Sequence, residues 1–114
     1  MSFADLKGRT AVVTGAARGI GFAIADNLAR GGADIVVIDL AREASDAAAA
    51  KLAQHGVKAI GVAANVASAE GVKKACEESL KLSGKIDILV NNAGITRDNL
   101  LIRMKDEEWD AVLT

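Results

Sequence analysis

Short apolar runs alternate with longer amphipathic stretches along most of this chain. The apolar runs are rich in β-branched residues and lie within residues 10–14, 33–39, 57–64 and 86–90, and the first of them is continuous. Continuous runs, in contrast to alternating ones, indicate strands buried on both faces, as in a parallel sheet covered by helices. We expect the third strand to be the weakest, because Gly61 interrupts its run.

The stretches between these runs have helical character. The first places five apolar residues on one helical stripe: Ile20, Ile24, Ala25, Leu28 and Ala29. The pair Gly31-Gly32 predicts where that helix ends. Residues 42–54 are rich in alanine, which favours a second helix, and His55-Gly56 predict its end.

A third helix is predicted from an N-cap at Ser68 to Ser83-Gly84. Its apolar stripe contains Val72, Ala75, Cys76, Ser79 and Leu80. Residues 91–103 are predicted as a loop, and the acidic residues 106–108 as the first turn of a further helix.

Alternating strands and helices with short connections predict an α/β fold of the Rossmann type, a doubly wound parallel sheet with right-handed connections. The expected strand order is 3-2-1-4, so the turns after the four strands meet at one edge, where ligands bind in such sheets. One edge of the fourth strand then lacks a partner. We therefore expect self-association through that edge, a swapped element or an unstable isolated chain, with a homo-oligomer favoured.

Composition narrows the class of protein. The 114 residues form one predicted domain, 51% hydrophobic and 25% charged. The net charge of −1 gives no electrostatic reason to expect nucleic acid or an anionic membrane as a partner. A single cysteine, Cys76, excludes an internal disulfide and is typical of a reducing compartment. No apolar run approaches membrane-spanning length, so we expect a cytoplasmic protein.

Three glycines follow the first strand with the spacing G-x-x-x-G-x-G. Gly15 allows the chain to reverse, Gly19 allows backbone to approach a pyrophosphate, and Gly21 allows the helix to pack close to the strand. The first turn of the helix then offers free N–H groups and the positive end of its dipole to an anion. The spacing favours nucleotide binding, and a purely structural glycine turn is the alternative.

Asp39 closes the second strand, where an acid can accept hydrogen bonds from ribose hydroxyls and repel a 2′-phosphate. This position favours NAD(H) as the cofactor. NADP(H) stays possible, because the guanidinium group of Arg18 or of Arg42 can bind a phosphate. Asp39 can also serve as the N-cap of the next helix.

Polar residues also end the third and fourth strands. Asn65 can accept from the adenine amine and donate to a ring nitrogen, while the Val66 N–H faces the ring edge; a simple turn asparagine is the alternative. Asn91 and Asn92 can anchor polar groups. The small residues that follow, Ala93-Gly94, allow backbone to approach a ribose and a nicotinamide.

Together these motifs resemble those of the short-chain dehydrogenase/reductase family: Thr14-Gly15-x-x-x-Gly19-Ile20-Gly21, Asn65-Val66 and Asn91-Asn92-Ala93-Gly94. Residues 95–109 are similar to the subgroup of 3-oxoacyl-[acyl-carrier-protein] reductases. The resemblance implies binding of a dinucleotide by Gly15, Arg18, Gly19, Ile20, Gly21, Asp39, Leu40, Asn65, Val66, Asn92, Ala93 and Gly94. Many reductases of that subgroup use NADPH, whereas Asp39 favours NAD(H).

The resemblance also implies a catalytic Tyr-x-x-x-Lys pair, a serine and an asparagine. The sequence contains no tyrosine, so no catalytic residue is assigned, and no metal ligands are predicted. His55 is predicted at a solvated helix end and Cys76 in the core. Residues 1–114 are thus predicted to supply cofactor binding to an enzyme that reduces 3-oxoacyl thioesters of acyl-carrier protein, without the catalytic half of the family; a stand-alone or engineered dinucleotide-binding fragment is the alternative.

Overall fold

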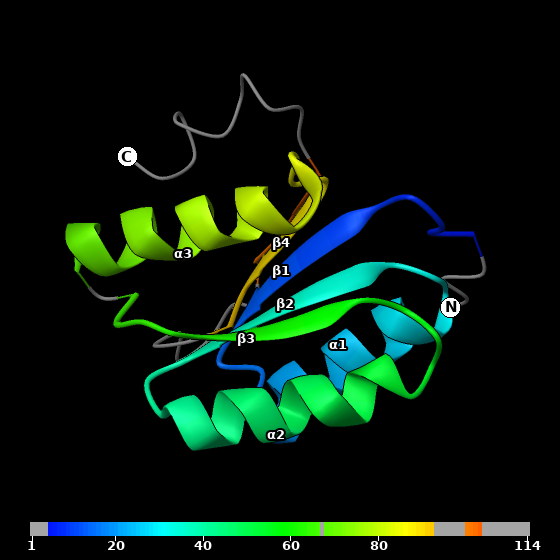
Figure 1. Cartoon of the computed structure of the whole chain (residues 1–114), viewed down its shortest axis with the longest axis horizontal. Coiled ribbons are helices and arrows are strands. Elements are labelled where there is room, and N and C mark those ends of the chain that lie inside the picture. The colour runs from blue at the N-terminus through cyan, green and yellow to red at the C-terminus, as the bar shows by residue number, and fades with distance from the viewer. Residues whose placement is uncertain (1–4, 67, 93–99, 104–114) are drawn as a thin grey trace.

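A central sheet lies between two layers of helices (Figure 1). The computed structural model describes residues 5–66, 68–92 and 100–103. Its elements are β1 (Thr10–Thr14), α1 (Gly19–Arg30), β2 (Asp34–Asp39), α2 (Arg42–Ala53), β3 (Ala59–Ala63), α3 (Ala69–Ser83), β4 (Ile88–Asn91) and β5 (Leu100–Arg103). The first three predicted helices and the four predicted strands are confirmed, with bounds that shift by at most two residues.

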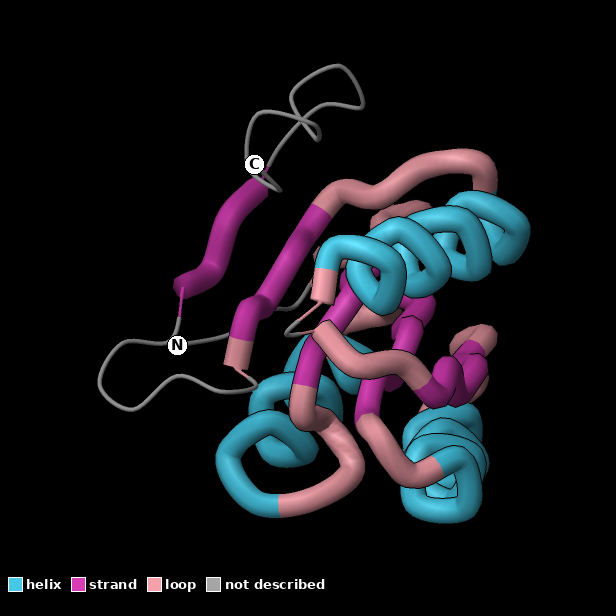
Figure 2. Tube along the Cα trace, turned by 90° about the vertical axis from the view of Figure 1, so that its left-hand side faces the viewer, coloured by secondary structure: helices cyan, strands magenta, loops and turns pink. Residues whose placement is uncertain are grey.

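The strand order is β3-β2-β1-β4-β5, and the pairs among the first four strands are parallel. The predicted 3-2-1-4 order and the Rossmann-type class are therefore confirmed. Every residue of β1 is buried, as is the interior of β2, because helices cover both faces of these strands. Turning the molecule by 90° shows the strands flanked by helices on both sides (Figure 2).

Two hydrophobic cores lie on opposite faces of the sheet. Val13, Val37 and Leu28 belong to the core under α1 and α2, whereas Val12 and Ile38 belong to the core under α3. Neighbouring residues of β1 and β2 thus point to different cores, which explains their continuous apolar runs. Within the described residues, no helix is both long and apolar enough to cross a membrane.

The fourth strand corrects one prediction. Residues 91–103 were expected to form a loop, but residues 100–103 form β5, which pairs antiparallel with β4 in the register Leu89↔Ile102. The edge of β4 that was expected to lack a partner is therefore covered by the same chain. Self-association stays a prediction, and the helix expected from residue 106 lies outside the described residues.

The stripe predicted for α1 is also partly wrong. Ala25, Leu28 and Ala29 are buried, but Ile20 is 67% exposed, and Gly21 takes its place against the sheet. The first turn of α1 therefore leaves its apolar side chain exposed.

Candidate functional site

The carboxyl ends of β1, β2, β3 and β4 meet at one edge of the sheet, and the predicted site residues follow those ends. The β1–α1 connection and first helical turn contain Gly15, Arg18, Gly19, Ile20 and Gly21; β2 ends at Asp39 before Leu40; Asn65 and Val66 follow β3; and Asn92 follows β4. Ala93 and Gly94 lie outside the described residues. The fold therefore brings the described predicted residues to the same edge.

The glycine turn has the backbone shape that its spacing predicted. Gly15 and Gly19 have positive φ angles of 65° and 64°, a conformation that glycine adopts without steric cost. The Gly15 N–H donates to the Ile38 carbonyl at 2.7 Å, which joins the turn to β2. A Cβ on Gly19 would have nothing within 4 Å. The backbone of this turn is thus open to a ligand.

The amino end of α1 carries no cap from the side chain of its N-cap residue. Its N-cap residue is Arg18, which makes no side-chain cap hydrogen bond, and the first turn contains no acidic residue. The N–H groups there and the helix dipole favour an anion. An adenine dinucleotide carries its diphosphate in the form that such a helix end accepts, so the turn fits that group.

Gly21 permits close approach between three segments. A Cβ at this position would lie 2.3 Å from the Gly15 carbonyl oxygen and 2.7 Å from Nδ2 of Asn92. The Asn92 Nδ2 donates to that same carbonyl at 3.4 Å. The predicted close packing of Gly21 is confirmed, and any side chain there would displace the turn.

Backbone N–H groups hold the Asp39 carboxylate in place. Oδ1 accepts from the Leu40 N–H at 2.8 Å, and Oδ2 accepts from the Ala17 N–H at 3.4 Å. The N-cap of α2 is Ala41, with no side-chain cap, so the alternative of Asp39 as the helix cap is wrong. The acid is instead tied to the glycine turn.

The residues around Asp39 are exposed. Leu40 is 72% exposed, and Arg18 is exposed at the start of α1. Arg42 pairs with Asp46 one helical turn along α2, at 3.9 Å. A guanidinium group engaged so loosely retains donors for another anion.

The Asn65 turn connects β3 to α3. The Asn65 carbonyl accepts from the Ser68 N–H at 3.2 Å and from Ser68 Oγ at 3.1 Å, while its side chain is exposed. The Ala64 N–H donates to the Asp39 carbonyl at 3.0 Å. The backbone of Asn65 thus takes part in a turn, which was the alternative to its role at the adenine ring.

Thr14 links the two halves of the edge and was absent from the predicted site residues. Thr14 is 5% exposed, and its hydroxyl accepts from the Asn92 N–H at 2.8 Å. It also lies 3.3 Å from Oδ1 of Asn91 and 3.4 Å from the Val90 carbonyl, either of which can accept its hydrogen. The sequence signal that could have identified Thr14 is a polar residue at the end of an apolar strand.

Comparison with known proteins agrees with this geometry. Residues 9–114 match the family model described as short chain dehydrogenase. The chain belongs to that family. Its 3-oxoacyl-[acyl-carrier-protein] reductase relatives include one from Aquifex aeolicus, 48% identical over 95% of this chain and 44% of the relative. One from Synechocystis is 49% identical over the same shares.

Solved structures give the same picture. A xylitol dehydrogenase with NAD⁺ bound is 39% identical and has a TM-score of 0.75, covering 79% of this chain and 35% of the other. An L-sorbose reductase from Gluconobacter frateurii, in complex with NADPH and L-sorbose, is 38% identical with a TM-score of 0.77, over 93% and 41%. The chain thus spans less than half the length of these relatives.

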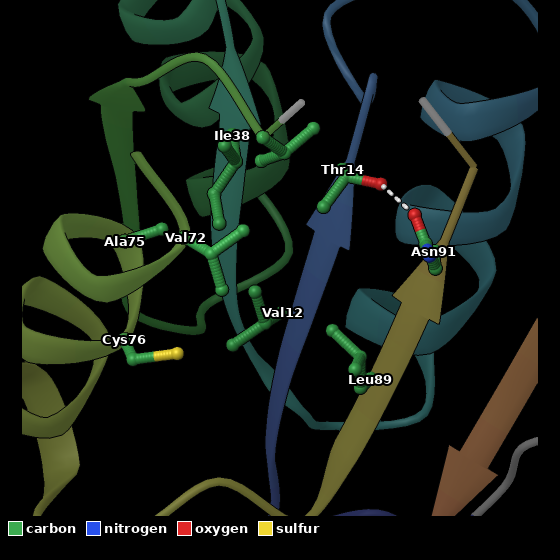
Figure 3. Close-up of a pocket in the computed structure, with 9 residues that line it drawn as sticks. Val12, Thr14, Ile38, Val72, Ala75, Cys76, Leu89 and Asn91 are labelled. Atoms are coloured by element: carbon green, nitrogen blue, oxygen red, sulfur yellow. Dashed lines mark hydrogen bonds between the residues drawn. The ribbon is translucent and has the colours of Figure 1, made fainter. Parts of the chain in front are cut away.

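A small cavity of about 70 Å³ lies between α3 and the sheet (Figure 3). Its lining is mainly apolar and includes Val12, Val72 and Leu89, with Thr14 and Asn91 as its polar residues. Val66 also lines it, but none of the three glycines of the phosphate turn does. The cavity is therefore adjacent to the predicted dinucleotide site and distinct from its phosphate turn.

The remaining candidate side chains lie elsewhere. His55 lies exposed just after the end of α2, as predicted, and its Nε2 lies 2.6 Å from Oδ1 of Asp26 on α1. Cys76 is partly buried against the core under α3, as predicted, and lines the cavity. No three His, Cys, Asp or Glu side chains gather as metal ligands in the part of the chain that the structure describes.

Proposed function

We propose that residues 1–114 are the dinucleotide-binding segment of an NAD(H)-dependent reductase. The observation that carries this proposal is the Asp39 carboxylate, held by two backbone N–H groups and tied through Ala17 to the glycine turn. A carboxylate there accepts from the two hydroxyls of an adenosine ribose whose diphosphate lies on the adjacent helix end. It also repels a 2′-phosphate, which disfavours NADP(H).

The other residues at this edge would contact different parts of the dinucleotide. The diphosphate would lie at Gly19 and the start of α1, with Ile20 beside it, and the adenine at Asn65 and Val66. The nicotinamide end would lie at Asn92 and the small residues 93–94. When bound, the dinucleotide supplies the hydride. The chain itself orients the cofactor through backbone groups that the fold fixes before binding.

For the substrate, we propose a 3-oxoacyl thioester on acyl-carrier protein, reduced to the 3-hydroxyacyl thioester by a complete enzyme. The support is the name shared by the Aquifex and Synechocystis relatives, at 48% and 49% identity. Reduction places a hydride on the ketone carbon and a proton on its oxygen. Because the 114 residues contain no tyrosine, we propose that the proton donor expected for this family lies outside them.

Titration with NADH and with NADPH tests the cofactor assignment. We expect saturable binding of NADH and at least about tenfold weaker binding of NADPH, because like charges placed together are costly. Asp39→Asn should narrow that preference by about tenfold. Glu78→Gln, a partly exposed carboxylate on α3 that pairs with Lys81 in the same helix, is the control and should leave it unchanged. Tighter binding of NADPH to the unmodified chain would reverse the assignment.

An assay of 3-oxoacyl thioester reduction tests the proposal that this segment binds the cofactor while the proton donor lies elsewhere. The chain alone should bind NADH and show no turnover above the rate without protein. Turnover by the 114 residues alone would contradict the proposal that the proton donor lies elsewhere. If neither NADH nor NADPH binds saturably, the proposal that this segment binds a dinucleotide is wrong. Binding without catalysis in every longer form of the protein would favour the alternative, a dinucleotide-binding fragment.

A further inference from the structure

Gly71 stands inside the first turn of α3, where glycine is a costly choice. Apart from proline, glycine is the least favourable residue for a helix interior, so we looked to close packing to explain its presence. A Cβ at Gly71 would lie 1.8 Å from the Asn65 carbonyl oxygen, 2.6 Å from its carbon and 3.0 Å from its nitrogen. The three nearest atoms thus all belong to the backbone of one residue, Asn65.

Further contacts fix that residue beneath the helix. The Asn65 carbonyl accepts from both the N–H and the Oγ of Ser68, at 3.2 and 3.1 Å. The Gly71 N–H donates to that same Oγ at 3.0 Å, which closes the arrangement. Lys74, one turn along α3, donates from Nζ to the Ala63 carbonyl at 3.2 Å. The first turns of α3 therefore set the position of the end of β3.

We infer that Gly71 is a positioning residue that sets where Asn65 meets the adenine ring. The inference rests on the proposed function, in which Asn65 and Val66 read the edge of the adenine. Real Cβ atoms stay at least 3.0 Å from such neighbours, so a methyl group at Gly71 moves the Asn65 backbone by more than about 1 Å. Hydrogen bonds operate over a range of about 0.5 Å, so that displacement takes the amide out of reach of the ring.

The effect differs from a general loss of packing. Gly61 offers a matched case, because a Cβ there would lie 2.6 Å from the Ser45 carbonyl carbon and 2.7 Å from Oδ1 of Asp46. Those atoms belong to α2, on the opposite face of the sheet from α3. Gly61→Ala therefore crowds the same strand without pressing on Asn65.

The test compares binding of NAD⁺ with binding of 1,N⁶-etheno-NAD⁺. In this analogue a fused ring removes the hydrogens of the exocyclic amine and the lone pair of N1, so adenine loses both the donor for Asn65 and the ring acceptor at this edge. The unmodified chain should prefer NAD⁺ by about tenfold, the loss expected for a hydrogen bond left unmade. Gly71→Ala should reduce the preference to less than about twofold by weakening NAD⁺ alone, whereas Gly61→Ala should retain it.

Ser68→Ala supplies a second and milder variant. It removes the hydroxyl on the Asn65 carbonyl from an exposed position, and it should lower the preference by about twofold to threefold. If Gly71→Ala does not fold, as judged by circular dichroism, this variant decides. An undiminished preference in the folded variants, or equal binding of both dinucleotides by the unmodified chain, would overturn the inference. Absence of saturable NAD⁺ binding by the unmodified chain would instead overturn the proposed function on which it rests.

Discussion

At the scale of single residues, one buried hydroxyl joins the two sides of the site. Thr14 ends β1, and its Oγ accepts from the N–H of Asn92, a residue 78 positions later in the chain. A threonine hydroxyl can accept and donate at once, and here the neighbouring Asn91 and Val90 oxygens lie within reach of its hydrogen. The hydroxyl thus holds the turn after β4 against the start of the glycine turn.

Thr14→Val should lower the free energy of unfolding by about 1–2 kcal/mol, because valine keeps the volume but leaves the Asn92 N–H without this acceptor. Urea titration followed by circular dichroism measures the change. Thr14→Ser retains the hydroxyl and should lose less than the valine variant. A valine variant as stable as the unmodified chain would show that water or another group satisfies the Asn92 N–H equally well.

Residue identity alone predicted some of these roles. The spacing of Gly15, Gly19 and Gly21 predicted their backbone shapes, since each role depends on neighbours close in the sequence. Gly71 was not singled out. Its reason is the approach of a helix to the end of a strand, and a single glycine in a helical stretch does not say which backbone it meets.

At the scale of elements, a carboxylate on α1 ties that helix to the end of α2. Oδ1 of Asp26 lies 2.6 Å from Nε2 of His55, and Oδ2 accepts from Nε of Arg30 at 2.8 Å. The hydrogen bond with His55 is the main cause that lowers the pKa of Asp26, with Arg30 adding to it against a smaller opposing effect of burial. The two helices on one face of the sheet are therefore held together by a partly exposed hydrogen bond.

Asp26→Asn should lower the free energy of unfolding by less than about 1 kcal/mol at neutral pH, the usual range for partly exposed pairs. Because the pKa of Asp26 is lower in the folded chain than in the unfolded chain, its charge stabilises the fold above the unfolded pKa. That contribution is lost as the pH falls below about 4 and through the lowered folded pKa. The difference between variant and unmodified chain should therefore shrink on acidification.

Urea titrations at several pH values measure this difference. Asp46→Asn is the control, since its carboxylate is 55% exposed and pairs with Arg42 at 3.9 Å within one helix. It should change stability little at any pH. A difference for Asp26→Asn that stays constant down to pH 2.5 would show that the carboxylate does not act through its charge.

Elements with a strong local pattern were predictable, and the one that depends on a distant partner was not. β1 and the interior of β2 are apolar runs buried by helices, and β3 and β4 are short, mainly apolar runs beside them. β5 comes after residues 91–99 in the chain and is defined by its antiparallel pairing with β4, in the register Val90↔Leu101. Nothing in the spacing of Leu100 and Leu101 fixes which strand they join, so the sequence was compatible with a loop there.

At the scale of the whole molecule, the candidate site exists only when the sheet is assembled. Its described residues come from the ends of four strands, and hydrogen bonds join Gly15 to Ile38, Ala64 to Asp39 and Asn92 to Thr14. An unfolded chain cannot bring these groups together. A dinucleotide that binds this edge therefore binds the folded chain alone, and its binding free energy adds to stability.

This linkage makes a quantitative prediction for NADH. At a free concentration one hundred times its Kd, NADH should raise the free energy of unfolding by about 2.7 kcal/mol, and each further tenfold increase by about 1.4 kcal/mol. Chemical denaturation with and without the ligand measures the shift, and the Kd comes from an independent titration. Gly21→Val is the control, because its side chain would meet the Gly15 carbonyl and Asn92; any such variant that still folds should show little shift. A saturated chain that unfolds at the same denaturant concentration as the free chain would show that NADH binds a surface that survives unfolding, and the assembled edge would then not be its site.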